Sequence, residues 1–318
     1  MLSLLSYGEV LVDFLPSSAH NPSYTPLAGG APANVAVAYA KLGGNSYFAG
    51  GISSDDFGTM LMQQLQDQGV NTSYVNTVEN ANTAIVLVTL DKCGERAFNF
   101  YRNDTADMYY EKSQVDKINW QDIAVFHYCS NTLTNEQNHD NTLYALKRAK
   151  SNKVLISFDV NLRQQLWADL SLLPARVEAC LNESDIVKLS KDEASYLAAI
   201  KNVDISGYVS FLLTLGVKLI VITDGPNEVQ VTCASYSLMI AVPKITALDT
   251  TAAGDSFIAS FLFALSQDAD INQACLFNLL ENQTLVSSAV LFASKCGALT
   301  CQKMGAFAAL PSIKALAL

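Results

Sequence analysis

The sequence has little histidine, little positive charge and no long apolar run, and each shortage excludes a class of function. Only three histidines occur in 318 residues, so a histidine-rich metal site is not expected and a Ser-His-Asp triad has few candidates. The 20 basic residues are outnumbered by 30 acidic ones, which gives a net charge of -10. Because affinity for phosphate backbones and anionic lipids comes from clustered Lys and Arg, we expect neither a nucleic-acid partner nor a membrane partner.

Cysteine spacing and hydropathy argue against secretion and against a bilayer. The seven cysteines form no zinc or CxxC pattern, and no signal peptide is recognised. We therefore expect a reducing cytoplasm with mostly buried thiols, Cys296 and Cys301 among them. The most apolar stretch, residues 211–222, is interrupted by a glycine and a lysine and is too short to span a bilayer. No repeat or Pro/Ser-rich linker is visible, so residues 1–318 are expected to form a single domain.

Short apolar runs alternate with helix-sized segments through most of the chain. This alternation predicts an α/β fold, in which a mainly parallel sheet is covered by helices on both faces. Ligands of such sheets gather at the carboxyl ends of the strands. The expected strands are 2–7, 125–128, 154–158, 186–189 and 219–223, and the expected helices include 34–42, 57–68, 141–149 and 174–181.

Two segments depart from this alternation. Residues 10–28 and 83–101 predict strands without helices between them, the second with a turn at 91–95. We expect them to pair into a small β-sheet over the mouth of the main domain and interpret them as a lid. A sheet this small needs a partner for its apolar face, so the lid either closes over a ligand or contacts the lid of a second subunit in a homodimer.

The segment 249–255, Asp-Thr-Thr-Ala-Ala-Gly-Asp, places an acid on a turn of small residues at the mouth of an apolar helix. Small side chains allow a ligand to approach the backbone closely, and the first amides of a helix are unpaired donors at its positive end. The turn can therefore hold an anionic phosphate beside the carboxylate of Asp255. Taken alone, the segment is better explained by an acid that favours the helix dipole and by small residues that allow tight packing.

A second turn of small residues, Gly29-Gly30-Ala31-Pro32-Ala33-Asn34, precedes an alanine-rich helix. The glycines permit close approach of a ligand, and Asn34 can both donate and accept hydrogen bonds, as recognition of a polyol requires. Asp13, expected after an apolar strand at 9–12, can accept from sugar hydroxyls or can be an exposed turn acid.

Together the two motifs, GGAPAN and DTTAAGD, resemble the signatures of the PfkB, or ribokinase-like, family of sugar kinases. Their separation of more than two hundred residues is typical of that family, and the resemblance spans nearly the whole chain. Within the family the closest likeness is to the fructokinases. That likeness rests on further segments at 94–96, 100–103, 106–108, 126–128, 157–163, 166–167 and 185–193.

The resemblance implies a ribokinase-like three-layer sandwich that transfers the γ-phosphoryl group of ATP to a sugar hydroxyl, above all O6 of fructose. It implies Asp255 as the catalytic base, with the amides of Ala252, Ala253, Gly254 and Asp255 as the anion hole. The sugar contacts that it implies are Asp13, Gly29, Gly30, Asn34, Arg102 and Arg163.

The resemblance also implies ATP with Mg²⁺ and a monovalent cation such as K⁺. Lys188 and Glu193 match the segment that handles nucleotide phosphates and magnesium, the acid acting through water; the residues alone are also compatible with a surface pair. Asp249 and Thr251 match positions that often hold the monovalent cation. The remaining nucleotide positions implied are Thr223, Gly225, Gly254, Gly297 and Gly305.

Other functions stay open at this point. A 2-keto-3-deoxygluconate kinase, a ribokinase or a nucleoside kinase would share the fold and the base, and the pocket decides among them. A catalytically silent, sugar-binding regulatory protein on this scaffold would be expected to lose Asp255 or the anion turn, and both are present. Glu228 replaces a usual glycine and Met304 a frequent lysine, so nucleotide preference and cation dependence stay open, as does the oligomeric state.

Overall fold

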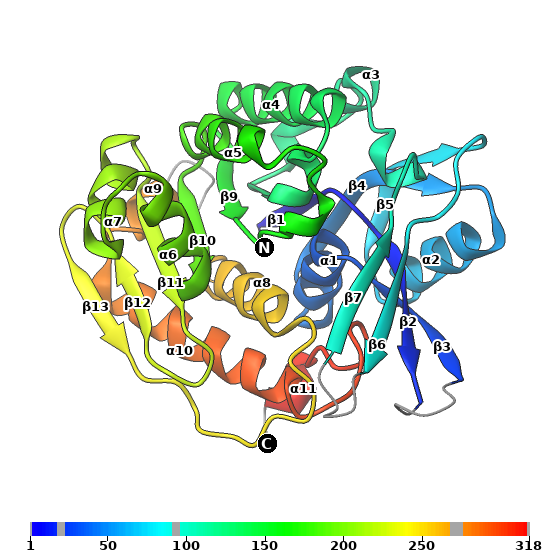
Figure 1. Ribbon diagram of the computed structural model, residues 1–318. Coiled ribbons are helices and arrows are strands. Elements are labelled where there is room, and N and C mark those ends of the chain that lie inside the picture. Colours follow the sequence, from blue (N-terminus) through cyan, green and yellow to red (C-terminus); the bar gives the residue numbers. More distant parts are fainter. Residues whose placement is uncertain (1, 18–22, 91–95, 268–275, 317–318) are drawn as a thin grey trace.

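A nine-stranded sheet forms the centre of the protein, and helices cover both of its faces (Figure 1). The computed structural model describes residues 2–17, 23–90, 96–267 and 276–316. The strands of the central sheet are β1 (Ser3–Tyr7), β4 (Asn45–Ser53), β5 (Asn71–Val78), β8 (Val125–Cys129), β9 (Leu155–Asp159), β10 (Ile186–Ser190), β11 (Leu219–Thr223), β12 (Val229–Thr232) and β13 (Ser237–Ile240).

The strand order is β13-β12-β11-β10-β9-β8-β1-β4-β5. The pairs from β11 through β1 to β5 are parallel, whereas β12 pairs antiparallel with both β11 and β13. The chain runs from β1 to β4 on one side and later adds β8 on the other side. The strand order therefore reverses beside β1, which is the point at which sheets of this kind hold their ligands.

Two layers of helices pack against alternate strand residues. One layer contains α1 (Ala31–Lys41), α2 (Asp56–Asp67), α8 (Ala253–Leu265) and α10 (Gln283–Thr300); the other contains α4 (Glu136–Ser151), α5 (Leu173–Leu181), α6 (Lys191–Ile200) and α7 (Ile205–Thr214). In β1, Leu4 joins the first core and Leu5 the second, as expected for a strand buried on both faces. The shorter helices are η1 (Ala106–Met108), α3 (Lys112–Val115), η2 (Trp120–Asp122), η3 (Ser130–Leu133), η4 (Gln164–Leu166), η5 (Leu170–Leu172), α9 (Leu276–Leu279) and α11 (Ile313–Leu316).

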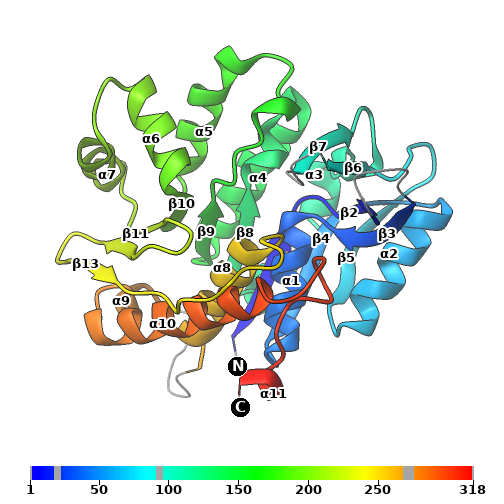
Figure 2. The same ribbon diagram turned by 60° about the horizontal axis from the view of Figure 1, so that its bottom comes forward.

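A separate four-stranded sheet lies at one side of the molecule, next to α2 (Figure 2). Its order is β3 (Tyr24–Gly29), β2 (Leu11–Pro16), β6 (Ile85–Leu90) and β7 (Arg96–Tyr101). The two segments predicted to form the lid therefore do pair with each other, through a parallel contact between β2 and β6. The turn predicted at 91–95 lies outside the described residues.

The expected strands and helices are confirmed, with small differences in where they begin and end. Strand β4 was not anticipated, because Gly50 and Gly51 in its middle favour turns. Both glycines are needed there: a Cβ atom would lie 2.2 Å from the carbonyl oxygen of Gly8 at residue 50, and 2.0 Å from that of Ala106 at residue 51. Cys301 is only partly buried, contrary to expectation. No helix within the described ranges is long and apolar enough to cross a membrane.

Candidate active site

A cavity of about 550 Å³ lies between the carboxyl ends of the central strands and the lid, a volume typical of small-molecule sites. It is lined at the reversal of the strand order by Glu9, which follows β1, and by Asn131, which follows β8. The lid contributes Leu11, Asp13, Val86, Phe98 and Phe100, and the start of α8 contributes residues 250–255.

Helix α8 begins at the motif predicted to bind an anion. Ala252 at its N-cap has a left-handed backbone with φ of 59°, which costs a non-glycine residue about 1 kcal/mol or more. Among the described residues, no side chain caps this end of the helix, and its first turn lines the cavity. The positive end of α8 therefore faces the space where a ligand would bind.

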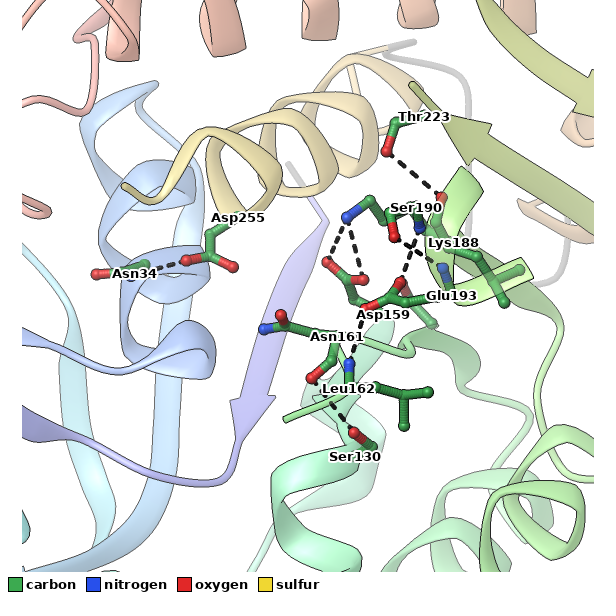
Figure 3. Close-up of polar contacts among 12 residues, drawn as sticks. Asn34, Ser130, Asp159, Asn161, Leu162, Lys188, Ser190, Glu193, Thr223 and Asp255 are labelled. Carbon is green, nitrogen blue, oxygen red and sulfur yellow. Dashed lines mark hydrogen bonds and ion pairs between the residues drawn. The ribbon is translucent and has the colours of Figure 1, made fainter. Parts of the chain in front are cut away.

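Asp255 and Asn34 contact each other in the lining of the cavity, although they are 221 positions apart in the sequence. The amide nitrogen of Asn34 on α1 donates a hydrogen bond of 2.7 Å to Oδ2 of Asp255 on α8 (Figure 3). Burial raises the pKa of Asp255, while this hydrogen bond and the charges of Lys188 and Arg163 oppose the rise. The result is a carboxylate more basic than an exposed aspartate and held in one orientation, as a general base requires.

Asp13 lies inside strand β2, not after a strand as the sequence suggested, and its register partner on β3 is Leu27. The lid therefore carries it into the cavity wall. Burial raises the pKa of Asp13 to about 7, and the charges of Asp255 and Asp249 add to the rise. Its carboxyl group thus needs hydrogen-bond donors from a ligand to remain ionised near neutral pH.

The two glycines of the first motif leave room for these side chains. A Cβ atom on Gly29 would lie 2.1 Å from Oδ2 of Asp13. Gly30 has φ of 103°, and a Cβ atom there would lie 2.7 Å from the carbonyl oxygen of Glu9. Gly30 lines the cavity, and Gly29 makes space for the carboxylate that does so.

The two predicted sugar-binding arginines occupy different positions. Arg163 is exposed and lines the cavity, as predicted. Arg102 is buried behind the cavity wall: its Nε lies 2.5 Å from Oδ2 of Asp107, and its Nη1 donates to the carbonyl oxygen of Asn131 at 3.0 Å. The expectation that Arg102 itself contacts sugar or phosphate is therefore corrected, because its side chain is buried outside the cavity lining and two of its three nitrogens, Nε and Nη1, pair with protein groups.

Lys188 is buried beneath the anion-binding turn and pairs with Asp159 at 3.1 Å (Figure 3). It does not form a surface pair with Glu193. A Cβ atom on Gly254 would lie 3.1 Å from its ammonium nitrogen, so this glycine keeps the cation close to the helix backbone. Burial raises the pKa of Asp159 to about 7 against the attraction of Lys188. This cation provides the local positive field that a chain of net negative charge needs to bind a phosphate.

Glu193 forms hydrogen bonds with two backbone segments. One carboxylate oxygen accepts from the amide of Ser190 and the other from the amide of Leu162, both at 2.7 Å. The hydroxyl of Ser190 in turn accepts from the amide of Glu193, which completes a capping box at the start of α6. Glu193 thus ties the loop after β9 to α6, and its side chain is not in the lining of the cavity.

Of the remaining predicted nucleotide and cation positions, Asp249, Gly297 and Gly305 contact the turn 249–255 or the start of α8. Asp249 is buried; its two oxygens accept from the amides of Thr251 and Gly305, each at 2.9 Å, and so tie the loop after α10 to the turn. Gly297 packs α10 against α8, because a Cβ atom would lie 3.3 Å from the carbonyl oxygen of Ala253. Thr223 ends β11 and Gly225 follows with φ of 51°. These positions, Asp249, Gly297, Gly305, Thr223 and Gly225, are not in the lining of the cavity.

Sequence reasoning missed several residues that line the cavity: Glu9, Asn131, Asn161, Phe98 and Phe100. Glu9 and Asn131 each follow an apolar strand, which was a usable signal, but only the adjacency of β1 and β8 brings them together. His127, one of the three histidines, lies within β8, buried, with Nδ1 3.0 Å from the hydroxyl of Ser157. Burial lowers the pKa of His127 to about 3, so it is a neutral core residue.

Comparison with known proteins agrees with this geometry. The chain is 37% identical over 314 residues to probable fructokinase-5 of Arabidopsis thaliana, covering 97% of this chain and 94% of the relative. A fructokinase structure from Xylella fastidiosa with bound ATP matches with a TM-score of 0.94 and 32% identity, covering 99% of this chain and 97% of that one.

A double-mutant fructokinase from Vibrio cholerae O395 in its fructose-, ADP- and potassium-bound form matches with a TM-score of 0.88 and 31% identity, covering 100% of this chain and 97% of that one. Residues 1–313 match the model of the pfkB family of carbohydrate kinases. The family model and the relatives cover nearly the whole length, and the chain belongs to the pfkB family of carbohydrate kinases.

Proposed function

We propose that this protein is an ATP-dependent fructokinase that converts fructose and ATP to fructose 6-phosphate and ADP. The observation that carries the proposal is the Asp255 carboxylate, held by Asn34 at 2.7 Å beside the start of α8 and inside the cavity. This geometry supports a role for Asp255 as the base that accepts the hydroxyl proton and a role for the first amides of α8 as donors to the phosphoryl group.

The reaction follows from these groups. The sugar hydroxyl oxygen forms a bond to the γ-phosphorus, and the bond from that phosphorus to the β,γ-bridging oxygen breaks, so that ADP leaves. Asp255 accepts the hydroxyl proton as the new bond forms. The first amides of α8, with Lys188 nearby, stabilise the negative charge on the transferring group. Catalysis is thus mainly positioning and electrostatic stabilisation.

The charges of the cavity favour a neutral sugar over a sugar acid. Four carboxylates line it, those of Glu9, Asp13, Asp159 and Asp255, and of its lining residues only Arg163 and Lys188 are cationic. An anionic substrate such as 2-keto-3-deoxygluconate needs a cation for its carboxylate, and Lys188 is already paired with Asp159, which leaves Arg163 among the cationic lining residues. A polyol instead supplies hydroxyl donors to the carboxylates, and the fructose-bound relative supports fructose among neutral sugars.

The residues of this site fit an Mg²⁺ ion that would bind together with the phosphates of the nucleotide. The described residues contain no cluster of three His, Cys, Asp or Glu side chains that could hold a metal, and Mg²⁺ commonly binds through phosphates, water and one or two carboxylates. We assign Glu193 as the carboxylate that would act through water, and the ion would supply positive charge at the phosphates. For a monovalent cation such as the potassium of the Vibrio relative, we assign the turn of Asp249 and Thr251.

A homodimer through the lids is a further part of the proposal. In the described part of the lid, β3 and β7 are the outer strands, and Tyr101 at the end of β7 is 60% exposed. An outer strand with an exposed aromatic side chain is suited to contact a second copy. Sedimentation of the wild-type protein and of Tyr101→Lys should show a dimer only for the former; a wild-type monomer would reject this part.

We also propose that the protein works in the cytoplasm. The support is that the five cysteines within the described ranges are free thiols, four of them buried. Fractionation of cells should recover the activity with cytoplasmic markers, and recovery with an organelle would contradict it.

A panel of sugars tests the main proposal. ADP release should be fastest, by kcat/KM, with fructose when compared with ribose, nucleosides and 2-keto-3-deoxygluconate, and ³¹P NMR should identify the 6-phosphate. Buried polar groups left unpaired by a wrong sugar should give strong discrimination. Faster turnover of ribose or of the sugar acid would reject fructose as the substrate while leaving the kinase assignment in place. Absence of phosphorylation of every sugar would reject the kinase function itself.

A further inference from the structure

We propose that Asn131 is a further sugar-contacting residue and that Glu9 and Arg102 fix the orientation of its amide. The inference rests on the proposed function in one respect, that the ligand of the cavity is a neutral sugar. Glu9 follows β1 and Asn131 follows β8, and these strands pair in parallel with Tyr7 opposite Tyr128. The two side chains therefore lie side by side at the reversal of the strand order, in the lining of the cavity.

The hydrogen bond between Asn131 and Glu9 determines which end of the amide is available. Nδ2 of Asn131 donates to Oε1 of Glu9 at 2.8 Å. In this bond the nitrogen of the amide faces Glu9, so the oxygen of the amide faces elsewhere. Oδ1 of Asn131 is buried and has no hydrogen-bond partner among the described residues. A buried acceptor of this kind is unfavourable unless a ligand satisfies it.

Asn34 shows the same arrangement on the other side of the cavity. Its Nδ2 donates to Asp255, and its Oδ1 is likewise buried without a partner among the described residues. Each asparagine thus gives its donor to a carboxylate and retains an unused acceptor, and both line one cavity. Two such acceptors suit a ligand that brings several hydroxyl donors, which is what a sugar offers and a flat apolar ligand does not.

Arg102 holds this pair in place from behind. Its Nη1 donates to the main-chain oxygen of Asn131 at 3.0 Å, and its Nε is paired with Asp107. Glu9 is 1% exposed; burial raises the pKa of its carboxyl group, and the charge of Arg102 opposes that rise. The charge of Arg102 thus favours the form of Glu9 that accepts from the Asn131 amide, and its hydrogen bond to the main chain holds Asn131 in place. It is a positioning residue and not a sugar contact.

Deoxyfructose analogues, each lacking one hydroxyl, provide the test. In the wild-type protein, removal of the hydroxyl that Asn131 accepts should lower kcat/KM about 5- to 10-fold, the usual worth of one hydrogen bond. Asn131→Ala should lower kcat/KM for fructose by a similar factor, mainly through KM, and should then be indifferent to removal of that same hydroxyl. Non-additivity between one substitution and one hydroxyl identifies a direct contact.

Asn141→Ala is the matched control. Asn141 is similarly buried, its Nδ2 has no partner among the described residues, and it lies on α4 outside the cavity lining. This variant should respond to every analogue as the wild type does. If Asn131→Ala also loses the same factor as the wild type for every missing hydroxyl, the proposed contact is wrong. If Asn131→Ala does not fold, Asn131→Ser replaces it, because the serine side chain is too short to reach the sugar hydroxyl that Asn131 would bind.

Glu9→Gln tests the orienting role. The glutamine keeps the shape of the glutamate but can donate as well as accept, so the amide of Asn131 is free to turn over. In Glu9→Gln we expect the ratio of kcat/KM for fructose to kcat/KM for the analogue that lacks the Asn131-bound hydroxyl to fall toward the ratio in Asn131→Ala, with little change in kcat. The same ratio should fall in Arg102→Lys. Wild-type discrimination in Glu9→Gln would refute the orienting role.

The assay also separates this inference from the proposed function. If the wild type prefers another neutral sugar, fructose fails as the substrate, and the deoxy analogues of that sugar test Asn131 in the same way. If no sugar is phosphorylated, calorimetric titration with fructose and its analogues still measures the contact. Equal affinities of the wild type and Asn131→Ala would then overturn it.

Discussion

Replacement of Asp255 by asparagine should lower turnover and raise stability in the same protein. Asparagine has nearly the shape of aspartate, and its Oδ1 can still accept the 2.7 Å hydrogen bond from Asn34, so sugar binding should change little. It cannot take up the hydroxyl proton. Loss of a positioned base costs about 10²- to 10⁴-fold in kcat, which is about 2.7–5.4 kcal/mol at 1.36 kcal/mol per factor of ten.

The stability change follows from the burial of the charge. Burial raises the pKa of Asp255 in the folded protein, so the ionised carboxylate is less favourable when folded than when unfolded. The wild type therefore gains stability as pH falls through the folded pKa, and it carries the full penalty above that pKa. An asparagine in this position has no charge to bury, so the variant should unfold at a higher temperature than the wild type at pH 8, with a difference that shrinks on acidification.

Asp224→Asn is the control with the opposite sign. The hydrogen bond from Lys191 lowers the pKa of Asp224, so folding favours the ionised form of Asp224. Replacement of Asp224 by asparagine should therefore lower the stability of the protein above the unfolded pKa. Turnover by ADP release and thermal unfolding from pH 5 to 8 measure both effects. Near-normal turnover of folded Asp255→Asn would remove Asp255 from the mechanism. A lower unfolding temperature at pH 8 would contradict the argument from buried charge.

Three further predictions follow from the same geometry. Gly29→Ala should raise KM for fructose at least several-fold with little loss of stability, because the new Cβ would lie 2.1 Å from Oδ2 of Asp13 and force that carboxylate to move. An unchanged KM would mean that Asp13 does not bind sugar. Lys188→Met leaves the buried carboxylate of Asp159 unpaired and should cost about 3–5 kcal/mol of unfolding free energy. Adding Asp159→Asn should restore most of that stability. Because Lys188 lowers the pKa of Asp255, Lys188→Met should also move the acid limb of the kcat/KM profile to higher pH. Amide exchange in β2 and β6 should slow on addition of fructose if the lid closes, and unchanged exchange at saturating sugar would make the lid static.

Local patterns in the sequence were sufficient to predict the class of fold and the turn of small residues at the start of α8. Apolar runs of strand length alternate with helical segments, and that periodicity depends only on neighbours along the chain. The turn 249–255 was equally readable, because its small residues, its acid and the following apolar helix are contiguous. The likeness to sugar kinases rests on the same contiguous motifs.

Long-range packing decided what the individual side chains do. Arg102 follows a lid strand and seemed free to reach a ligand, yet folding pairs it with Asp107 and the backbone of Asn131. Lys188 and Glu193 are five residues apart, but Lys188 pairs with Asp159 on a neighbouring strand while Glu193 caps a helix. The contacts of Arg102 with Asn131 and of Lys188 with Asp159 depend on which strands are adjacent, and the local sequence does not encode that adjacency. The contacts of Arg102 with Asp107 and of Glu193 with Ser190 are local, only five and three residues apart.

By itself, then, the sequence determined an α/β sugar kinase with a lid and with Asp255 at the start of a helix, because these features arise from short-range periodicity and contiguous motifs. Only the tertiary structure decided that Asn34 holds Asp255 and that Glu9 holds Asn131. Hydrogen bonds between residues 221 and 122 positions apart depend on the order of strands in the sheet. That order is set by the burial of both faces of the sheet at once, which is a property of the whole chain.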